Sequence, residues 1–406
     1  MRINEERLRS RMDAINRIAV TEEGGMMRLA LSDADKTARD LLKSWIKEAG
    51  MEVRIDDLGT IQGYLPGTDP NSLPIGVGSH MDTQPNGGRY DGLFGVMSGL
   101  EAVCTLIDNG ITMKSPLVVI DWTNEEGARF VPPMLASGVV AGNFDVNWVY
   151  AKEDKNGIKY VDELTRIGYM GSKSNRFEKA KAYIEPHIEQ GPILDQEGYE
   201  FGIVTGALGI TGLDVKIKGE TNHAGTTPMR NRKDALMVAA EAMLELRKKT
   251  IEYGDPAVIT MGIISASPAS KNIVPGEVYF SIDMRHDNDE ALTRLEQDVR
   301  EIIQKVCSDN CAESHIERYW RADPVHFDEG IINASEKVAN KLKIRAKRIY
   351  SGAGHDAVFI NRIIPTGMLF VPSIKGMSHC PQEDTKWEDI VTGTEMLTEL
   401  LIKIDK

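Results

Sequence analysis

The sequence predicts an α/β domain, with a central sheet and helices on both faces, that is interrupted by an inserted β-α-β-β-α-β unit of the ferredoxin-like kind. Towards both ends of the chain, helical periodicity alternates with short β-branched runs, as α/β layers require. The middle of the chain instead reads strand, helix, strand, strand, helix, strand. Because this topology brings its two ends close together, such a unit can be inserted into another domain. We therefore expect a discontinuous domain, residues 1–212 with 326–406, and an inserted domain, residues 213–325.

Each expected element rests on a local pattern. In the first domain, helical spacing that ends at a glycine predicts helices over residues 37–50 and 92–110, and β-branched runs predict strands over 73–77 and 117–122. In the insert, the same criteria predict strands over residues 213–219, 257–264, 278–285 and 315–320, and helices over 234–250 and 290–307. After residue 325 the α/β pattern resumes and closes with a helix over residues 387–404.

Composition limits the class of partner. The 406 residues include 48 Lys and Arg against 61 Asp and Glu, a formal net charge of −13. This is the wrong sign for a surface that gathers phosphate backbones or anionic lipid, so we expect neither nucleic acid nor membrane as a partner. The four cysteines are few for this length, and neither a signal peptide nor a run long enough to span a membrane is evident. These features predict a cytoplasmic protein.

Several of the eight histidines lie beside carboxylates and glycines at expected strand ends, where α/β sheets place ligands. His80 and Asp82 alternate along an extended segment, so the carboxylate of Asp82 could hold the imidazole of a metal-binding histidine by its other nitrogen. Glycines around Asp91 predict a tight loop in which that carboxylate could reach two cations. Taken singly, each motif could equally be a hydrogen-bonded loop histidine with a solvated acid.

Glu125 and Glu126 directly follow the apolar strand expected over residues 117–122. Neighbouring side chains of an extended backbone point to opposite sides, so the two glutamates cannot easily do the same job. One could bind a metal ion while the other acts as a general base on an activated water. A surface acidic pair is the alternative.

Together, these motifs resemble one family of enzymes. In chain order they are SHMDT, GGRYDG, TNEEGARF, HIEQGP, NHAGTTPM, NIVPGEV, DMRH, SGAGHDA and GMSHC. The set resembles the amidohydrolases that include N-carbamoyl-L-amino-acid hydrolase, β-ureidopropionase and allantoate amidohydrolase, which are related to the dinuclear zinc aminoacylases and dipeptidases. The motifs run from about residue 76 to residue 381, so the resemblance spans most of the chain.

The resemblance implies two divalent metal ions per subunit, with Asp91 as the bridging ligand and Glu125 as the base. The other implied ligands are His80 and His187 for one ion, and Glu126 and His379 for the other. Zn²⁺ suits such a set, as do Mn²⁺, Co²⁺ and Ni²⁺. Cys380 is not needed as a ligand. The family also implies a cis peptide bond between Asp91 and Gly92.

The remaining motifs are expected to hold the substrate. The amide of Gln190 can donate and accept, so it could read a ureido group, and the planar fork of Arg285 matches a carboxylate unless it pairs with a nearby aspartate. The resemblance implies that His223 and Asn272 stabilise the oxyanion. Gly354 could offer backbone contacts to the substrate carboxylate, and His355 could be a packed structural histidine.

The expected function is metal-dependent hydrolysis of the carbamoyl C–N bond of an N-carbamoyl-L-amino acid or N-carbamoyl-β-alanine, releasing the amino acid, carbon dioxide and ammonia. Allantoate amidohydrolase is the nearest alternative, followed by an aminoacylase or dipeptidase. A catalytically silent amide-binding relative would lack a ligand or the base, yet all five ligands and Glu125 are present. The inserted domain is expected to act as a lid and to form a homodimer.

Overall fold

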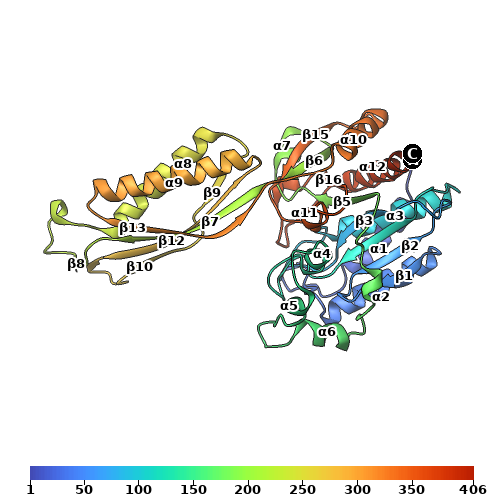
Figure 1. Cartoon of the computed structure of the whole chain (residues 1–406), viewed down its shortest axis with the longest axis horizontal. Helices are drawn as coiled ribbons and strands as arrows, with labels where there is room; N and C mark the ends of the chain where they lie inside the picture. Colours follow the sequence, from blue (N-terminus) through green and yellow to red (C-terminus); the bar gives the residue numbers. More distant parts are fainter. The chain divides into compact units, whose positions relative to one another are not determined.

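The computed structural model describes all 406 residues, and the chain divides into two compact units. Unit 1 comprises residues 1–205 and 327–406, and unit 2 comprises residues 206–326. Within unit 1 a mixed sheet lies among helices, and within unit 2 two long helices lie along a sheet (Figure 1). The α/β class and the inserted unit predicted from the sequence are therefore present.

A sheet of nine strands, which belongs to unit 1 apart from β14 and the end of β6, has the order β1-β2-β4-β3-β5-β16-β6-β14, with β15 paired to β6. The strands are β1 (Glu52–Ile55), β2 (Ile61–Leu65), β3 (Ile75–His80), β4 (Leu117–Trp122), β5 (Ala182–Ile188), β6 (Phe201–Ala207), β14 (Val325–His326), β15 (Ala346–Ser351) and β16 (Thr366–Val371). The central strands β4, β3, β5 and β16 pair in parallel and are buried along their whole length. Strands of this kind must be covered on both faces, which the surrounding helices achieve.

The helices of unit 1 are α1 (Glu5–Ile15), α2 (Asp33–Glu48), α3 (Leu93–Asp108), α4 (Leu135–Val140), α5 (Val146–Tyr150), α6 (Tyr160–Arg166), α7 (Ile193–Glu197), α10 (Glu329–Leu342), α11 (Asp356–Ile360) and α12 (Trp387–Asp405), with short 3₁₀ turns at Lys173–Asn175 and Ile374–Gly376. α3 packs against β3, β4 and β5, and α12 packs against α3 and β16. α2 begins where the Ser32 side chain accepts a hydrogen bond from the Asp35 N–H, which satisfies a free donor of the first turn.

Unit 2 is a ferredoxin-like sheet of order β10-β12-β7-β13, with β9 paired to β12. Its elements are β7 (Gly209–Lys218), β8 (Asn222–His223), a 3₁₀ turn at Met229–Asn231, α8 (Ala235–Tyr253), β9 (Val258–Thr260), β10 (Ile264–Ser267), β11 (Ile273–Val274), β12 (Glu277–His286), α9 (Asp289–Asp309) and β13 (Glu313–Ala322). Alternate residues of β12, from Val278 to Met284, are buried in a core shared with α8 and α9. β8 and β11 form a separate two-stranded sheet.

The single strand expected over residues 257–264 is wrong. β9 and β10 both pair with β12, but residues 261–263 lie opposite only residues 281 and 282. One extra residue therefore bulges from the ladder beside Gly262 and divides the strand. The hydrophobic pattern could not show this, because a bulge changes the backbone pairing and leaves the local composition unchanged.

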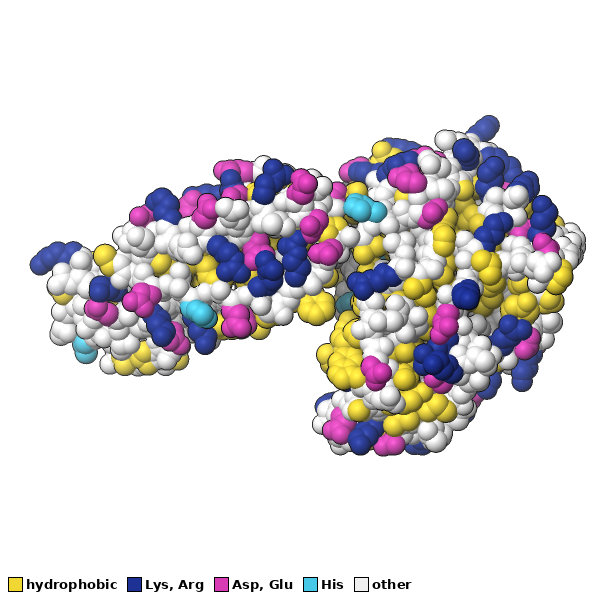
Figure 2. All heavy atoms as spheres, viewed as in Figure 1, with side chains coloured by type: hydrophobic (Ala, Val, Ile, Leu, Met, Phe, Trp, Pro, Cys, Tyr) yellow, Lys and Arg dark blue, Asp and Glu magenta, His cyan; other side chains and the backbone are white.

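On the face in view, acidic and basic side chains are interspersed over both units (Figure 2). None of the helices combines the length and apolar character needed to cross a membrane.

Candidate metal centre

The carboxyl ends of three central strands of unit 1 bring the predicted ligands together. His80 is the last residue of β3, and it lies opposite Trp122, the last residue of β4. Glu125 follows Trp122 by three residues. His187 is near the end of β5, and Asp91 precedes α3. Parallel strands gather their carboxyl ends at one edge of a sheet, so residues far apart in sequence meet there.

Two groups of candidate ligands share Asp91. One is His80, Asp91 and His187, and the other is Asp91, Glu126 and His379; within each, the ligand atoms all lie within 4.8 Å of one another. Oδ1 of Asp91 lies 3.2 Å from Nε2 of His187, and Oδ2 lies 3.1 Å from Nε2 of His379. Imidazole nitrogens and carboxylate oxygens in this number fit two divalent cations of the zinc type.

Two of the imidazoles are oriented by main-chain carbonyls. Nδ1 of His80 lies 3.0 Å from the carbonyl of Asp82, and Nδ1 of His187 lies 2.9 Å from the carbonyl of Ile188. A carbonyl only accepts, so Nδ1 carries the proton in each ring, and the lone pair of each Nε2 lies on the side of Asp91. In this structure Nε2 of His187 also accepts the Gly92 N–H at 3.2 Å.

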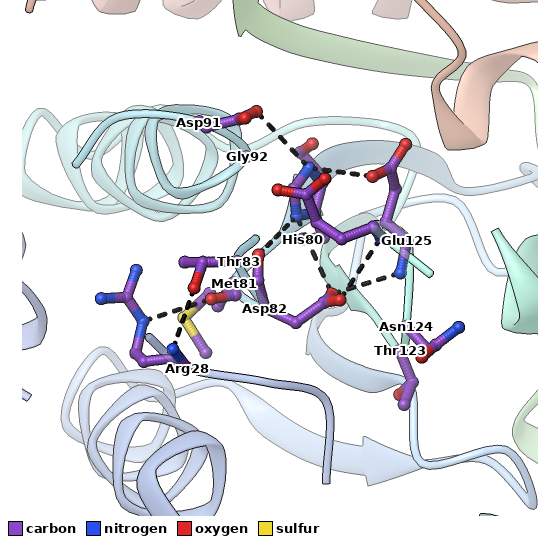
Figure 3. A network of polar contacts seen from close by, with 12 residues as sticks. Arg28, His80, Met81, Asp82, Thr83, Asp91, Gly92, Thr123, Asn124 and Glu125 are labelled. Carbon is purple, nitrogen blue, oxygen red and sulfur yellow. Dashed lines mark hydrogen bonds and ion pairs between the residues drawn. The ribbon is translucent and has the colours of Figure 1, made fainter. Parts of the chain in front are cut away.

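The Asp82 carboxylate does not hold His80 as the sequence suggested. Its Oδ1 lies 3.8 Å from Nδ1 of His80, and the carboxylate instead accepts the main-chain N–H groups of Glu125 at 3.2 Å and Glu126 at 3.3 Å (Figure 3). Behind it, the buried Arg28 donates from Nε to the carbonyl of Met81 at 3.2 Å. The segment from Met81 to Asp82 therefore fixes the loop that carries both glutamates.

Glu125 and Glu126 have different surroundings, as their adjacent positions predict. Glu125 is 6% exposed, and burial together with the nearby carboxylates of Asp356 and Glu126 raises its pKa well above the usual range. Its Oε2 lies 3.5 Å from Nε2 of His80. Glu126 accepts two hydrogen bonds from Gln84, to Oε1 at 3.1 Å and to Oε2 at 2.9 Å, so it is held beside Asp91 and His379.

A cavity of about 170 Å³ opens beside the ligands. Its wall contains His80, Gln84, Asp91, Glu125, Glu126, Pro133, Met134, His187, Gln190, Ala353, Gly354, His355 and His379. Nε2 of Gln190 lies 3.1 Å from Oδ2 of Asp91, whereas its buried Oε1 has no hydrogen-bond partner. His355 is buried, and its Nε2 lies 2.9 Å from Oγ of Ser351.

The expected cis peptide between Asp91 and Gly92 is wrong, because the cis bonds of the chain all precede proline. The chain turns into α3 through Gly92, whose φ of 61° is readily adopted only by glycine. A Cβ at this position would lie 2.4 Å from the His80 ring. Glycine is therefore required both for the turn and for the close approach of the ligand.

Three of the predicted substrate-binding residues lie in unit 2. His223 and Asn272 are neighbours there, since the Ala224 N–H donates to the Asn272 carbonyl at 2.9 Å. Nδ1 of His223 accepts from the Gly225 N–H at 3.0 Å, so the ring proton is on Nε2. Arg285 lies near the carboxyl end of the long strand β12, and its Nε lies 2.9 Å from Oδ1 of Asp283.

Sequence reasoning missed Gln84 and Glu383. Gln84 holds Glu126, and Glu383 accepts hydrogen bonds from the main-chain N–H groups of Tyr90 and Asp91, both at 3.0 Å. No motif spacing could have indicated either residue. Their importance depends on which loops the fold brings beside them.

Residues 76–403 match the family model of Peptidase family M20/M25/M40. The chain belongs to this family. An N-carbamoyl-L-amino-acid amidohydrolase of Rhizobium meliloti is 39% identical over 402 residues, which cover 99% of this chain and 97% of that protein. An allantoate amidohydrolase of Bacillus subtilis is 35% identical over 387 residues, which cover 94% of this chain and 93% of that protein.

Solved structures give the same result. A hydantoinase/carbamoylase family amidase from Burkholderia ambifaria aligns with a TM-score of 0.96 at 38% identity, covering 100% of this chain and 98% of that one. The resemblance predicted from the motifs is therefore confirmed, and the chain is an amidohydrolase of the M20/M25/M40 family.

Proposed function

We propose that this amidohydrolase cleaves the carbamoyl C–N bond of N-carbamoyl-L-amino acids or N-carbamoyl-β-alanine, releasing the amino acid, carbon dioxide and ammonia. The observation that carries the proposal is one cavity that combines two cation-binding groups with the buried Glu125. Relatives at 39% and 36% identity are named N-carbamoyl-L-amino-acid amidohydrolases, which supports this substrate class.

The residues present fit two divalent metal ions per subunit. His80, His187 and Asp91 would hold one ion, and Asp91, Glu126 and His379 would hold the other. Zn²⁺ suits these ligands best, with Mn²⁺, Co²⁺ or Ni²⁺ as alternatives. When bound, such ions polarise a carbonyl and lower the pKa of a water molecule.

Glu125 is proposed as the general base. It takes a proton from the attacking water and later delivers it to the departing nitrogen, so no net proton is consumed at the glutamate. A carboxyl group whose pKa is raised by burial and by neighbouring carboxylates holds such a proton well. Asp82 keeps the main chain of Glu125 in place through its hydrogen bond.

Gln190 is proposed to recognise the ureido group. Its Nε2 is committed to Asp91 and Ser378, at 3.1 and 3.2 Å, while its Oε1 is buried without a partner. An unpaired acceptor of this kind favours a ligand that brings N–H donors, since leaving the acceptor unpaired is costly. A ureido group supplies such donors.

The other substrate contacts are proposed from chemistry alone. Arg285 would bind the substrate carboxylate and Gly354 would add main-chain contacts to it. His223 and Asn272 would donate to the oxyanion, for which the Nε2 proton of His223 is available.

Allantoate hydrolysis is the second candidate function. Allantoate is also a ureido acid, and the relative from Bacillus subtilis is named an allantoate amidohydrolase. Aminoacylase or dipeptidase activity would use the same metal chemistry on another amide.

We also propose that the chain forms a homodimer through unit 2. Three apolar side chains at seven-residue spacing on α8 are exposed: Met237 at 61%, Leu244 at 58% and Ile251 at 67%. Such a stripe on a helix fits a second copy of the same surface.

The proposed location is the cytoplasm. The four cysteines are all free, which fits that reducing compartment.

The deciding experiment is a substrate panel on metal-reconstituted protein, in which ammonia release is measured for the ureido acids and amino-acid release for the N-acetyl amino acids and dipeptides. N-carbamoyl amino acids, N-carbamoyl-β-alanine, allantoate, N-acetyl amino acids and dipeptides are compared by kcat/KM. The proposal expects the highest value for an N-carbamoyl amino acid or N-carbamoyl-β-alanine. A highest value for allantoate would select the second candidate, and turnover of none of the ureido acids would contradict both.

A further inference from the structure

Glu383 is a buried glutamate that lies between two ligand-bearing loops. It is 1% exposed, and its Oε1 accepts the main-chain N–H groups of Tyr90 and Asp91, both at 3.0 Å. Its Oε2 accepts the hydroxyl of Ser378 at 2.9 Å. One carboxylate therefore joins the loop that carries Asp91 to the segment that carries His379.

The fit around this carboxylate is close. A Cβ at Gly88 would lie 1.9 Å from Cδ of Glu383, so a side chain at Gly88 is excluded while Glu383 occupies its place. Ser378 also accepts from Nε2 of Gln190 at 3.2 Å, and the same nitrogen lies 3.1 Å from Oδ2 of Asp91. Glu383 thus belongs to a continuous set of contacts that ends at the shared ligand.

The two candidate cation sites differ in how firmly their ligands are held. The side chains of His80 and His187 are 1% exposed, whereas that of His379 is 49% exposed. His379 also has a φ of 55°, which is unfavourable for a residue with a side chain, and it lies outside any helix or strand. Without support from its neighbours, this ligand would lose more freedom on binding an ion than the other two histidines.

We propose that Glu383 is a positioning residue that preorganises the site formed by Asp91, Glu126 and His379. Groups that orient metal ligands typically contribute 10- to 100-fold to metal affinity. Asp91 serves both sites, but the ion at His80 and His187 keeps two buried imidazoles. Loss of Glu383 should therefore weaken the ion at Glu126 and His379 and leave the ion at His80 and His187 nearly unchanged. The inference rests on the two-metal centre of the proposed function.

The test is a Zn²⁺ titration of metal-free protein by calorimetry, with competing chelator to reach high affinities. Glu383→Ala is expected to retain one site of wild-type affinity and to weaken the other about 10- to 100-fold. Glu383→Gln is expected to lie between wild type and Glu383→Ala. Its amide oxygen can still accept from the N–H groups of Tyr90 and Asp91, but its amide nitrogen cannot accept the Ser378 hydroxyl.

Asp405 provides a matched control in the same unit. Its buried carboxylate accepts the main-chain N–H groups of Lys114 at 2.7 Å and Ser115 at 2.8 Å, at the opposite end of β4 from Glu125. Asp405→Ala should lower the melting temperature, as Glu383→Ala also should, but should leave both Zn²⁺ affinities at wild-type values. This comparison separates positioning of a ligand from general support of the fold.

The inference would be overturned, with the proposed function intact, if Glu383→Ala bound both ions with wild-type affinity. It would also be overturned if Glu383→Ala and Asp405→Ala both weakened the two ions to the same extent. If wild-type protein bound fewer than two ions, the proposed function would fail and this inference with it. Should Glu383→Ala not fold, Ser378→Ala carries the test, because it removes the contact between Glu383 and the His379 segment. Unchanged affinity for the weaker ion in that variant would then overturn the inference.

Discussion

The carboxylate of Asp82 holds the main chain of Glu125, with Oδ1 of Asp82 accepting the Glu125 N–H at 3.2 Å (Figure 3). The contact between Asp82 and His80 is made instead by the Asp82 carbonyl, at 3.0 Å from Nδ1. A side chain and a main-chain atom of one residue therefore serve two different parts of the site. Substitution of Asp82 removes only the first of these contacts.

Asp82→Ala should lower kcat while both metal ions remain bound. The carbonyl that orients His80 survives the substitution, and Gln84 still holds the Glu126 carboxylate although the Glu126 N–H loses its partner. The Glu125 main chain has no such second support, so we expect a fall in kcat of about 10- to 100-fold. Metal content and steady-state kinetics on the same preparation measure this. Loss of metal with unchanged kcat per metal-loaded protein would show that Asp82 serves the ligands instead.

Glu125→Gln should keep both ions and lose turnover. The amide has the size of the acid but cannot accept the water proton, and a positioned base typically contributes about 10² to 10⁴ in rate. Glu101→Gln is the control, because Glu101 is a buried glutamate paired with Arg7, and it does not line the cavity. Near-normal kcat in a metal-loaded Glu125→Gln protein would remove the assignment of the base.

Much of the fold could be predicted because its central elements carry strong patterns. The strand over residues 117–122 was predicted with its observed bounds, since its apolar run is buried on both faces. β7, in contrast, starts at Gly209, four residues before the expected start at Leu213. Residues 209–212 are held by main-chain pairing with β12 and β13, which a side-chain pattern does not reveal.

The candidate ligands could be predicted because their motifs, taken together and in order, resemble those of a family of metal-dependent amidohydrolases. Gln84 and Glu383 could not, because each acts on a neighbour that only the folded chain provides. The sequence also could not show that Asp82 contacts His80 through its carbonyl and Glu125 through its carboxylate, since residue type does not reveal which atom makes a contact.

Arg285→Lys should remove the preference for a substrate carboxylate. A lysine keeps the charge but cannot form two parallel hydrogen bonds to a carboxylate. The measurement is kcat/KM for an N-carbamoyl amino acid relative to its carboxamide. Asp283→Asn is the matched control, because it breaks the 2.9 Å pair and leaves Arg285 in place, so the preference should persist. An unchanged preference in Arg285→Lys would reduce Arg285 to the partner of Asp283.

His223→Ala should lose most of its kcat while metal binding and folding persist, because it removes a donor to the developing oxyanion. The proposed dimer makes a further test possible, in which inactive His223→Ala and inactive Glu125→Gln proteins are mixed. Recovered activity would show that His223 serves the partner's site, and its absence despite demonstrated subunit exchange would show that each chain supplies its own histidine. Light scattering measures the dimer itself, and Leu244→Glu, in the exposed stripe of α8, should yield monomers.

Relative to wild type, Asp56→Asn should raise the melting temperature more at pH 8 than at pH 5. Burial raises the pKa of Asp56 to about 7, although Oδ1 accepts the Leu58 and Thr60 N–H groups, both at 2.9 Å. In the unfolded chain the pKa of an aspartate is about 3.9. Between about pH 3.9 and about pH 7 the folded protein therefore binds more protons than the unfolded chain, and its stability falls as pH rises. Asparagine cannot ionise and avoids this loss. About two pKa units of the shift lie between pH 5 and pH 7, which limits the difference between pH 5 and pH 8 to roughly 3 kcal/mol.

Melting temperatures of both proteins at pH 5 and pH 8 give the result as a difference of differences, in which the other titrating groups cancel. Asp405→Asn is the control, because the pKa of Asp405 is shifted in the opposite direction to that of Asp56. Burial opposes the charge of Asp405, but hydrogen bonds from the Ser115 and Lys114 N–H groups outweigh it and lower its pKa. Asp405 is therefore ionised at both pH values, and its replacement should cost the same at each. A pH-independent effect of Asp56→Asn would mean that the Asp56 carboxylate is ionised in the folded protein without penalty.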